Sequence, residues 1–155
     1  QRPDAHFYIV GMNPAQTVRA LAGSHVIVTG TVPDVRPYLQ HAAAVVAPLR
    51  LARGIQNKIL EAMAMAKAVV VSSAATSGVT AASGVDFETA VDAEDFCRKV
   101  VAVLQPEVGR KMGQHARARI VADYNWTRNL SAFEKLLEPG TCSGAGRAAR
   151  SLDAH

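Results

Sequence analysis

Polar side chains stand at the start of an apolar helical segment in the middle of the chain. Asn57 and Glu61 are four residues apart, which places them one turn apart on a helix, with Lys58 beside them. Glu61 is the only acidic residue between Asp34 and Asp86. A solitary carboxylate in a neutral or basic stretch predicts a specific hydrogen-bond acceptor, and it can accept from two vicinal hydroxyls.

The loop ahead of this helix predicts an anion-binding site. The first N–H groups of a helix have no partner within it, and they present the positive end of the helix dipole. Gly54 lies in this loop, and Arg50, Arg53 and Lys58 add positive charge around it. A ligand with phosphates near the helix start and hydroxyls near Glu61 fits these groups, so a nucleotide is the candidate.

Each of these residues also has an ordinary structural explanation. Glu61 and Lys58 are spaced to form an ion pair on the helix surface. Arg53 and Lys58 are equally compatible with a solvated face, and Asn57 with a helix cap. Both sets of explanations stay open at the level of the sequence.

Metal and thiol chemistry have little support. Asp92 and Asp95 are considered as metal ligands together with Glu94, but two aspartates three residues apart are typical of a helix N-cap. The five histidines share no metal-ligand spacing. Cys97 and Cys142 form no close pair, and Cys97 falls in a helical pattern that predicts a core position. We predict no metal site and a reducing compartment.

Strand and helix patterns alternate along the chain. Strands are predicted at residues 6–10, 25–30, 44–49 and 68–72, with a short extra one at 84–88. The four long runs are apolar without alternation, as expected of parallel strands covered by helices on both faces. Two short helices are predicted first, one around Val18 to Ala22 and one that begins at Pro33 or Asp34. A third follows the apolar stripe of Ile55, Ile59, Ala62, Met63 and Ala66. Three more are predicted to begin at Asp92, at Pro106 and after Trp126.

Size and composition agree with one α/β domain. The 155 residues are 49% hydrophobic, which is enough for a single core. The net charge of +4 is spread along the chain, and the aromatic residues are too few for a nucleic-acid surface. No apolar run is long enough for a membrane span, and no signal peptide is visible. We predict a Rossmann-like domain over residues 1–138 and a disordered tail over 139–155.

The run from Arg53 to Val70 resembles the nucleotide-sugar signature of group 1, or family 4, glycosyltransferases of the GT-B fold. Similar landmarks are Tyr8-Ile-Val-Gly11, the turn at Gly30 with Val32, Ala47-Pro48 and Tyr124-Asn-Trp126. Their order along residues 6–137 is similar to that of the family's C-terminal domain. The Pro-Leu-Arg and Gly-Ile-Gln-Asn-Lys runs resemble those of sugar transferases linked to bacterial exopolysaccharide clusters.

The resemblance assigns roles to individual residues. Glu61 matches the second glutamate of the signature, which binds the donor ribose, whereas Arg53 replaces the first glutamate. Arg53 or Lys58 is therefore expected to neutralise the diphosphate as it leaves. Main-chain groups near Val32 would meet the base, and the set of substrate-binding residues is completed by Gly11, Gly54 and Asn57.

The resemblance also implies the activity and its context. It implies retaining transfer of a hexosyl group from a nucleotide-diphosphate sugar to an acceptor sugar or lipid-linked glycan, with no metal and no other cofactor. The family's opening β-α unit and N-terminal acceptor domain are expected to be absent, so no catalytic residue is named and the chain alone is expected to be inactive. The expected location is the cytoplasm, with membrane-surface association and dimerisation through an exposed sheet edge left open.

Two other classes of protein compete with a transferase. A non-catalytic nucleotide-binding or regulatory α/β module would carry the same anion site. A nicotinamide-binding Rossmann domain is less favoured, because no Gly-x-Gly-x-x-Gly follows the first strand.

Overall fold

The structure is a computed structural model that describes residues 2–51, 54, 56–76, 78–125 and 130. The chain divides into two units, Gln1–Asp123 and Tyr124–His155, and the first contains all the elements described below. The helix predicted after Trp126 and the tail over 139–155 lie outside the described residues, apart from Leu130.

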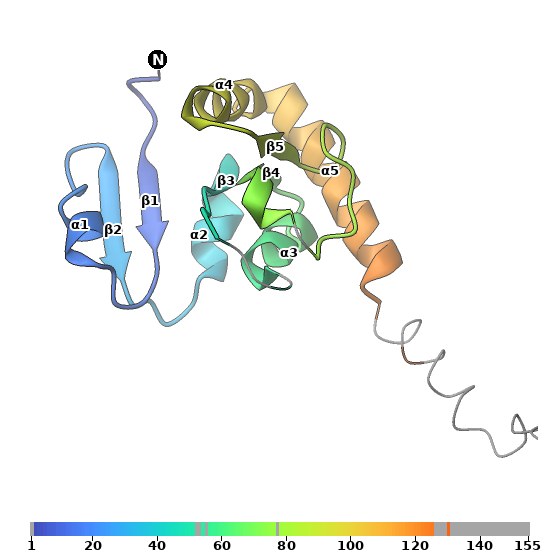
Figure 1. The fold of residues 1–155 in the computed structure, drawn as a ribbon, viewed down its shortest axis with the longest axis horizontal. Helices are drawn as coiled ribbons and strands as arrows, with labels where there is room; N and C mark the ends of the chain where they lie inside the picture. The colour runs from blue at the N-terminus through green and yellow to red at the C-terminus, as the bar shows by residue number, and fades with distance from the viewer. Residues whose placement is uncertain (1, 52–53, 55, 77, 126–129, 131–155) are drawn as a thin grey trace, which may run out of the picture. The chain divides into compact units, whose positions relative to one another are not determined.

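Strands and helices alternate as the sequence predicts (Figure 1). In chain order they are β1 (Phe7–Val10), α1 (Gln16–Arg19), β2 (Val26–Gly30), α2 (Arg36–His41), β3 (Ala44–Ala47), α3 (Asn57–Ala64), β4 (Ala68–Ser72), a 3-10 turn (Ser73–Ala75), β5 (Glu88–Ala90), α4 (Ala93–Val103) and α5 (Pro106–Asp123).

The strands form two parallel sheets. β1 pairs with β2, with Phe7 opposite Val26, and β4 lies between β3 and β5, with Val45 opposite Val69. Every strand pair is parallel, which confirms the α/β prediction made from the unbroken apolar runs.

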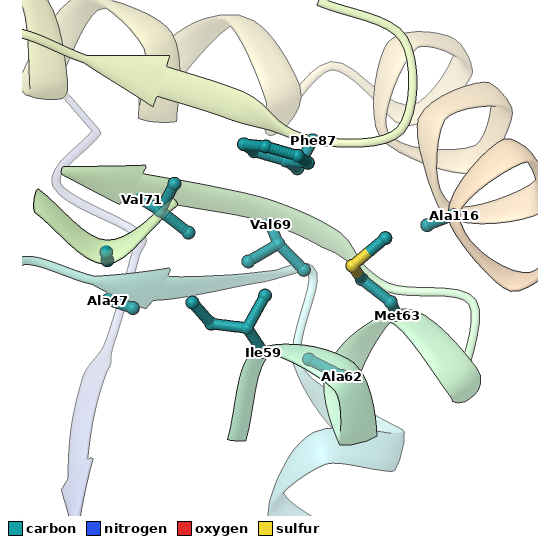
Figure 2. Close-up of a cluster of buried hydrophobic side chains, with 9 residues drawn as sticks. Ala47, Ile59, Ala62, Met63, Val69, Val71, Phe87 and Ala116 are labelled. Atoms are coloured by element: carbon teal, nitrogen blue, oxygen red, sulfur yellow. The ribbon is translucent and has the colours of Figure 1, made fainter. Parts of the chain in front are cut away.

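The two faces of β4 carry two separate clusters of buried side chains. Val69 and Val71 pack with Ile59, Ala62 and Met63 of α3, as Figure 2 shows. The alternate residues of β4, Ala68 and Val70, pack on the other face with side chains of α4 and α5. Helices therefore cover both faces of this sheet, as Figure 1 shows for α3 and α4.

Helix α5 holds α3 in place through a very close approach. A Cβ atom on Gly113 would lie 1.9 Å from the backbone oxygen of Ala66, which follows α3. Arg117 donates a hydrogen bond to the Ala64 carbonyl at the end of the same helix. The end of α3 opposite to Asn57 is thus fixed by backbone contact, which makes α3 a rigid support for side chains near its start.

Several predicted boundaries are shifted by local polar contacts. The second helix begins at Arg36 rather than at Pro33 or Asp34, because the Asp34 carboxylate accepts the Arg36 N–H at 2.9 Å in a turn before the helix. The first helix is a single turn and ends at Arg19, short of Ala22.

The extra strand is found at Glu88–Ala90 rather than at residues 84–88. The preceding residues form a turn instead, since Gly84 has φ +81° and the Asp86 carboxylate accepts the Ala82 N–H at 2.9 Å. Asp86 is buried and also accepts from Arg119 at 3.1 Å. Arg119 of α5 therefore pairs with a buried carboxylate far away in the sequence.

The predicted core position of Cys97 is also wrong. Cys97 is exposed on α4. The buried face of that helix is formed by Val103, with Phe96 and Val100 packed beside it. Cys97 lies one residue beyond Phe96, which turns it about 100° away from that face.

Candidate functional site

Most of the predicted site residues lie just beyond the carboxyl ends of strands or at the start of the helix that follows one. Gly11 directly follows β1, Val32 follows β2, and α3 begins after the loop that leaves β3. In open parallel α/β sheets, ligands bind in the crevice outside the carboxyl ends of the strands. The topology thus places these residues at the edge where a ligand is expected.

Lys58 and Glu61 line the same cavity. This cavity has a volume of about 1110 Å³, and its lining also includes Tyr38 and Pro48. Lys58 and Glu61 lie three residues apart on α3, and both are exposed. A cationic nitrogen and a carboxylate on one wall of a cavity can contact an anion and a pair of hydroxyls of the same ligand.

The start of α3 leaves backbone donors available. Gln56 is the N-cap residue and makes no side-chain cap hydrogen bond, and the first turn holds no acidic residue. The Gln56 carbonyl accepts from the N–H groups of Ile59 and Leu60. Among the described residues, no hydrogen bond reaches the N–H groups of Asn57 and Lys58, so both donors remain available at the helix start.

Asn57 is the first residue inside α3 rather than its cap. The alternative interpretation of Asn57 as the helix cap is therefore wrong. Its side chain is exposed and is not part of the lining of the cavity that holds Lys58 and Glu61.

Gly54 is required by the backbone of the loop. Its φ of +66° lies in the left-handed region, where a side chain is strained. The structure does not describe Arg53 or Ile55 on either side, so the role predicted for Arg53 lies outside the described residues.

The surface ion pair offered as the alternative for Glu61 does not form. Within the part of the chain that the structure describes, none of the salt bridges involves Glu61 or Lys58. Glu61 also lies off the apolar stripe, since Ile59, Ala62 and Met63 are the buried residues of α3. Its carboxylate is available to a ligand.

The cavity includes residues that the sequence did not mark as functional. Tyr38 of α2 lines it, and its ring lies 6.0 Å from that of Tyr8 on β1, centroid to centroid. Pro48 follows β3, and the next residue, Leu49, accepts a hydrogen bond from the Ser72 hydroxyl at the end of β4. In the sequence, Tyr38 falls in the helix predicted from Pro33 or Asp34, and Pro48 is part of the Ala47-Pro48 landmark at the end of a predicted strand.

Gly11 and Val32 do not line this cavity. Gly11 is exposed and Val32 is half-buried, each in a connection at the carboxyl end of its strand. The structure therefore brings together Lys58 and Glu61, and it leaves Gly11, Val32 and Asn57 outside the lining.

The acidic residues at the start of α4 form a cap, as predicted. The Asp92 carboxylate accepts the Asp95 N–H at 2.8 Å, and Asp95 accepts from the Val91 N–H at 3.1 Å. Arg98 lowers the pKa of Asp95 most strongly by hydrogen bonding, followed by the Val91 N–H and Lys99. No group of three or more metal-ligating side chains occurs within the described residues.

None of the helices within the described residues is both long and apolar enough to cross a membrane. The chain gives no match among curated protein sequences. Among solved structures, it is similar to the crystal structure of TarM with a TM-score of 0.68 and 16% sequence identity. The similarity covers 84% of this chain but only 28% of TarM, so the chain spans little more than a quarter of that protein.

The sequence of residues 1–106 matches the family of group 1 glycosyl transferases. These residues include β1 to β5, the cavity and the whole of α3. The family match thus covers the site and all five strands, but only the first residue of α5. The chain belongs to the group 1 glycosyltransferases and is a domain of the GT-B type.

Proposed function

We propose that this chain is the donor-binding domain of a retaining glycosyltransferase and that Glu61 holds the ribose of a nucleotide-diphosphate sugar. The observation that carries the proposal is the position of Glu61 and Lys58 on one wall of the cavity, near the uncapped start of α3. A carboxylate accepts from two vicinal hydroxyls, while the ammonium and the helix N–H groups face the phosphates.

Positive charge at the start of α3 would stabilise the nucleoside diphosphate as a leaving group. When the bond between the sugar and the diphosphate breaks, negative charge grows on the leaving phosphate oxygens. Lys58 and the free N–H groups of Asn57 and Lys58 stabilise that charge without a metal ion. We assign Arg53 the same role, since it stands five residues before Lys58 where the family's signature has a glutamate.

The base is assigned to the connection after β2. Val32 lies there, and its main-chain groups offer the donor and acceptor pair that a base edge needs. Gly11 and Gly54 keep their proposed places in the donor site, because neither presents a side chain that would obstruct a ligand.

The rest of the reaction belongs to chain segments outside these 155 residues. The chain covers 28% of TarM, and we propose that an acceptor domain supplies the catalytic base and binds a sugar or lipid-linked glycan. The proposed setting is bacterial exopolysaccharide or glycoconjugate synthesis at the cytoplasmic face of the membrane. This part of the proposal is supported by the family match and by the resemblance of the signature.

Calorimetric titration and thermal unfolding with UDP, GDP, ADP and NAD test the donor site. A nucleotide at about a hundred times its dissociation constant adds roughly 2.7 kcal/mol to the free energy of unfolding, which is a measurable shift for a domain of this size. We expect one nucleoside diphosphate to bind and NAD to fail.

Glu61→Gln is the informative variant, because it keeps the shape of the side chain and removes its charge. We expect at least a tenfold loss of nucleotide affinity with an unchanged melting temperature of the free protein. Glu94→Gln is the matched control, an exposed glutamate at the start of α4, and it should bind as the parent does. Equal affinity in parent and Glu61→Gln would exclude the ribose role.

A turnover assay separates the transferase from a non-catalytic module. The chain alone is expected to transfer no sugar, whereas a longer protein carrying the acceptor domain should do so and should lose activity on Glu61→Gln. Nucleotide binding without any transfer by the longer protein would favour a regulatory module.

A further inference from the structure

Ser72 ties the end of β4 to the loop that leads to α3. It is the last residue of β4, and its hydroxyl donates a hydrogen bond to the Leu49 carbonyl, 23 residues earlier in the chain. Leu49 is the second residue after β3, where the connection to α3 begins. The bond therefore joins one strand to the loop that leaves its neighbour.

This bond acts where backbone pairing between the two strands stops. The register ends with Ala47 opposite Val71. The next position along would set Pro48 opposite Ser72, and proline has no N–H to donate to a ladder. The Leu49 N–H turns back to the Ala47 carbonyl at 2.9 Å. The Ser72 hydroxyl thus extends the link between the strands to this turned segment.

Ser72 also stands where it could cap the turn that follows, and it does not do so. It is the N-cap residue of the 3-10 turn Ser73–Ala75, and its side chain makes no cap hydrogen bond. A serine before a helical turn commonly accepts one of its N–H groups. Here the hydroxyl bonds to Leu49 instead. Its hydrogen bond therefore serves the loop rather than the turn beside it.

Leu49 is a fixed point just ahead of the predicted anion donors. Its side chain packs against the buried cluster between α3 and β4, and its carbonyl is held by Ser72. Leu51, two residues further on, is 91% exposed, and Gly54 adopts φ +66° before α3 begins at Asn57. The other end of α3 is fixed against α5, so the anchor at Leu49 determines how the chain enters its start.

We propose that Ser72 is a positioning residue of the donor site. Through Leu49, its hydroxyl holds the loop ahead of α3, so that the loop and the N–H groups of Asn57 and Lys58 meet the diphosphate in one fixed arrangement. Ser72 does not line the cavity of Lys58 and Glu61, so it acts on the ligand through the backbone. A loop that is ordered before binding loses less conformational entropy when the anion binds. This inference rests on the proposed donor site and adds the group that orients its phosphate-binding part.

Three single variants isolate the hydroxyl. Ser72→Ala removes it, Ser72→Thr keeps it, and Thr76→Val is the matched control. The Thr76 hydroxyl donates to the Ser73 carbonyl at 2.8 Å, so its bond stays within the turn that follows β4. Valine has nearly the shape of threonine, so the control removes a hydroxyl with little change of volume. Melting temperatures of the free variants show that each one is folded.

NMR titration with inorganic pyrophosphate at constant ionic strength measures the phosphate site without a base or a ribose. In the parent, we expect the amide signals of Asn57 and Lys58 to shift. Ser72→Ala should raise the dissociation constant by about threefold to tenfold, the factor expected from one hydrogen bond. Ser72→Thr and Thr76→Val should bind as the parent does.

NMR relaxation measures the order of the loop itself. The order parameters of the Leu49 and Leu51 amides should fall in Ser72→Ala and stay unchanged in the other two variants. An affinity for pyrophosphate equal to that of the parent in Ser72→Ala, or equal weakening in Thr76→Val, would overturn the positioning role. Weaker binding with unchanged order at Leu49 would also overturn it, because the hydroxyl would then not act through the loop.

Glu61→Gln keeps this inference separate from the ribose role. It should weaken nucleotide binding but not pyrophosphate binding, whereas Ser72→Ala should weaken both. If Glu61→Gln binds nucleotide as the parent does while Ser72→Ala weakens pyrophosphate binding, the ribose role fails and the positioning role stands. The reverse result removes only the positioning role. A parent whose Asn57 and Lys58 amides do not respond to pyrophosphate has no phosphate site there, and the role of Ser72 fails with that site.

Discussion

The two sheets of this chain differ in what buries them. In the sheet of β3, β4 and β5, helices α3, α4 and α5 pack on the strands in two clusters of buried side chains. In the part that holds β1 and β2, no side chain between residues 2 and 43 is buried. The two parts have similar strands, so the difference arises from their neighbours rather than from their own sequences.

An apolar strand sequence predicts a strand that must be buried to be stable. Whether the strand is buried depends on the strands and helices around it. β1 and β4 are both apolar runs, but only β4 has strands on both sides and helices on both faces. A two-stranded sheet is marginal by itself. The part with β1 and β2 is therefore expected to be the less stable one, whereas the part with β4 contains its own core.

The largest effect should come from one added methyl group at Gly113. Its Cβ would lie 1.9 Å from the Ala66 oxygen, a backbone atom that cannot give way without moving α5 from α3. We expect Gly113→Ala to lower the free energy of unfolding by about 3 kcal/mol or more. The matched change in the first part, Gly23→Ala, meets nothing within 4 Å and should cost less than about 0.5 kcal/mol.

Urea unfolding of both alanine variants measures this contrast. Far-UV circular dichroism follows the loss of secondary structure, and a transition in two steps would reveal that the first part unfolds separately. Similar losses in the two variants would show that the two parts are equally well packed and would contradict the comparison.

A smaller effect is expected from removing one methylene group at matched isoleucines. Ile59 is 1% exposed in the cluster beneath β4, and Ile9 of β1 is half-buried. Ile59→Val should cost about 0.5–1.5 kcal/mol, and Ile9→Val less than that. The same urea titration measures both variants, and an equal cost at the two positions would contradict the comparison.

The sequence predicted best those features that are determined by neighbouring residues in the chain. The Asp92 cap, the buried stripe of Ile59 and Met63 and the exposed position of Glu61 follow from helical spacing, and all three are found. Each depends on contacts within one or two turns of helix.

Features that depend on distant segments were predicted less well. The pairing of Arg119 with buried Asp86 joins residues 33 positions apart, and nothing in the pattern around Arg119 distinguishes it from its solvated neighbours. The start of α2 was misplaced because the side chain of Asp34 holds a turn that competes with the helix. The cavity lining was likewise invisible, since it brings Tyr38 to residues of three strands.

Acid should affect the two parts differently. Arg98 and the Val91 N–H lower the pKa of Asp95, and Arg36 lowers that of Asp34. A carboxyl whose pKa is lower in the folded state stabilises fully above its unfolded pKa, about 3.9, and loses this effect as the pH falls through its folded pKa.

The Asp95 side chain is 8% exposed and that of Asp34 is 40% exposed. Asp95→Asn should therefore lower the melting temperature at pH 7, and the difference from the parent should shrink below about pH 4. Asp34→Asn should change it little, because solvent screens its ion pair. Melting curves from about pH 3 to pH 7 test this, and a constant deficit for Asp95→Asn across that range would exclude the role of its charge.

The smallest effect should be a gain at one of the two described non-glycine residues with left-handed backbone. Ala66 has φ +56° beside the α3–α5 contact, and Asn13 has φ +48° after β1. An alanine in this region costs about 1–2 kcal/mol through steric strain. A glycine in its place costs about 0.5–1 kcal/mol through the backbone entropy that it loses on folding. Ala66→Gly should thus raise the free energy of unfolding by about 0.5 kcal/mol.

Asn13→Gly is the control and should leave the free energy of unfolding unchanged, because asparagine tolerates this conformation. Urea midpoints with unchanged slopes measure both, and a loss in Ala66→Gly would mean that its methyl group packs more than its backbone is strained.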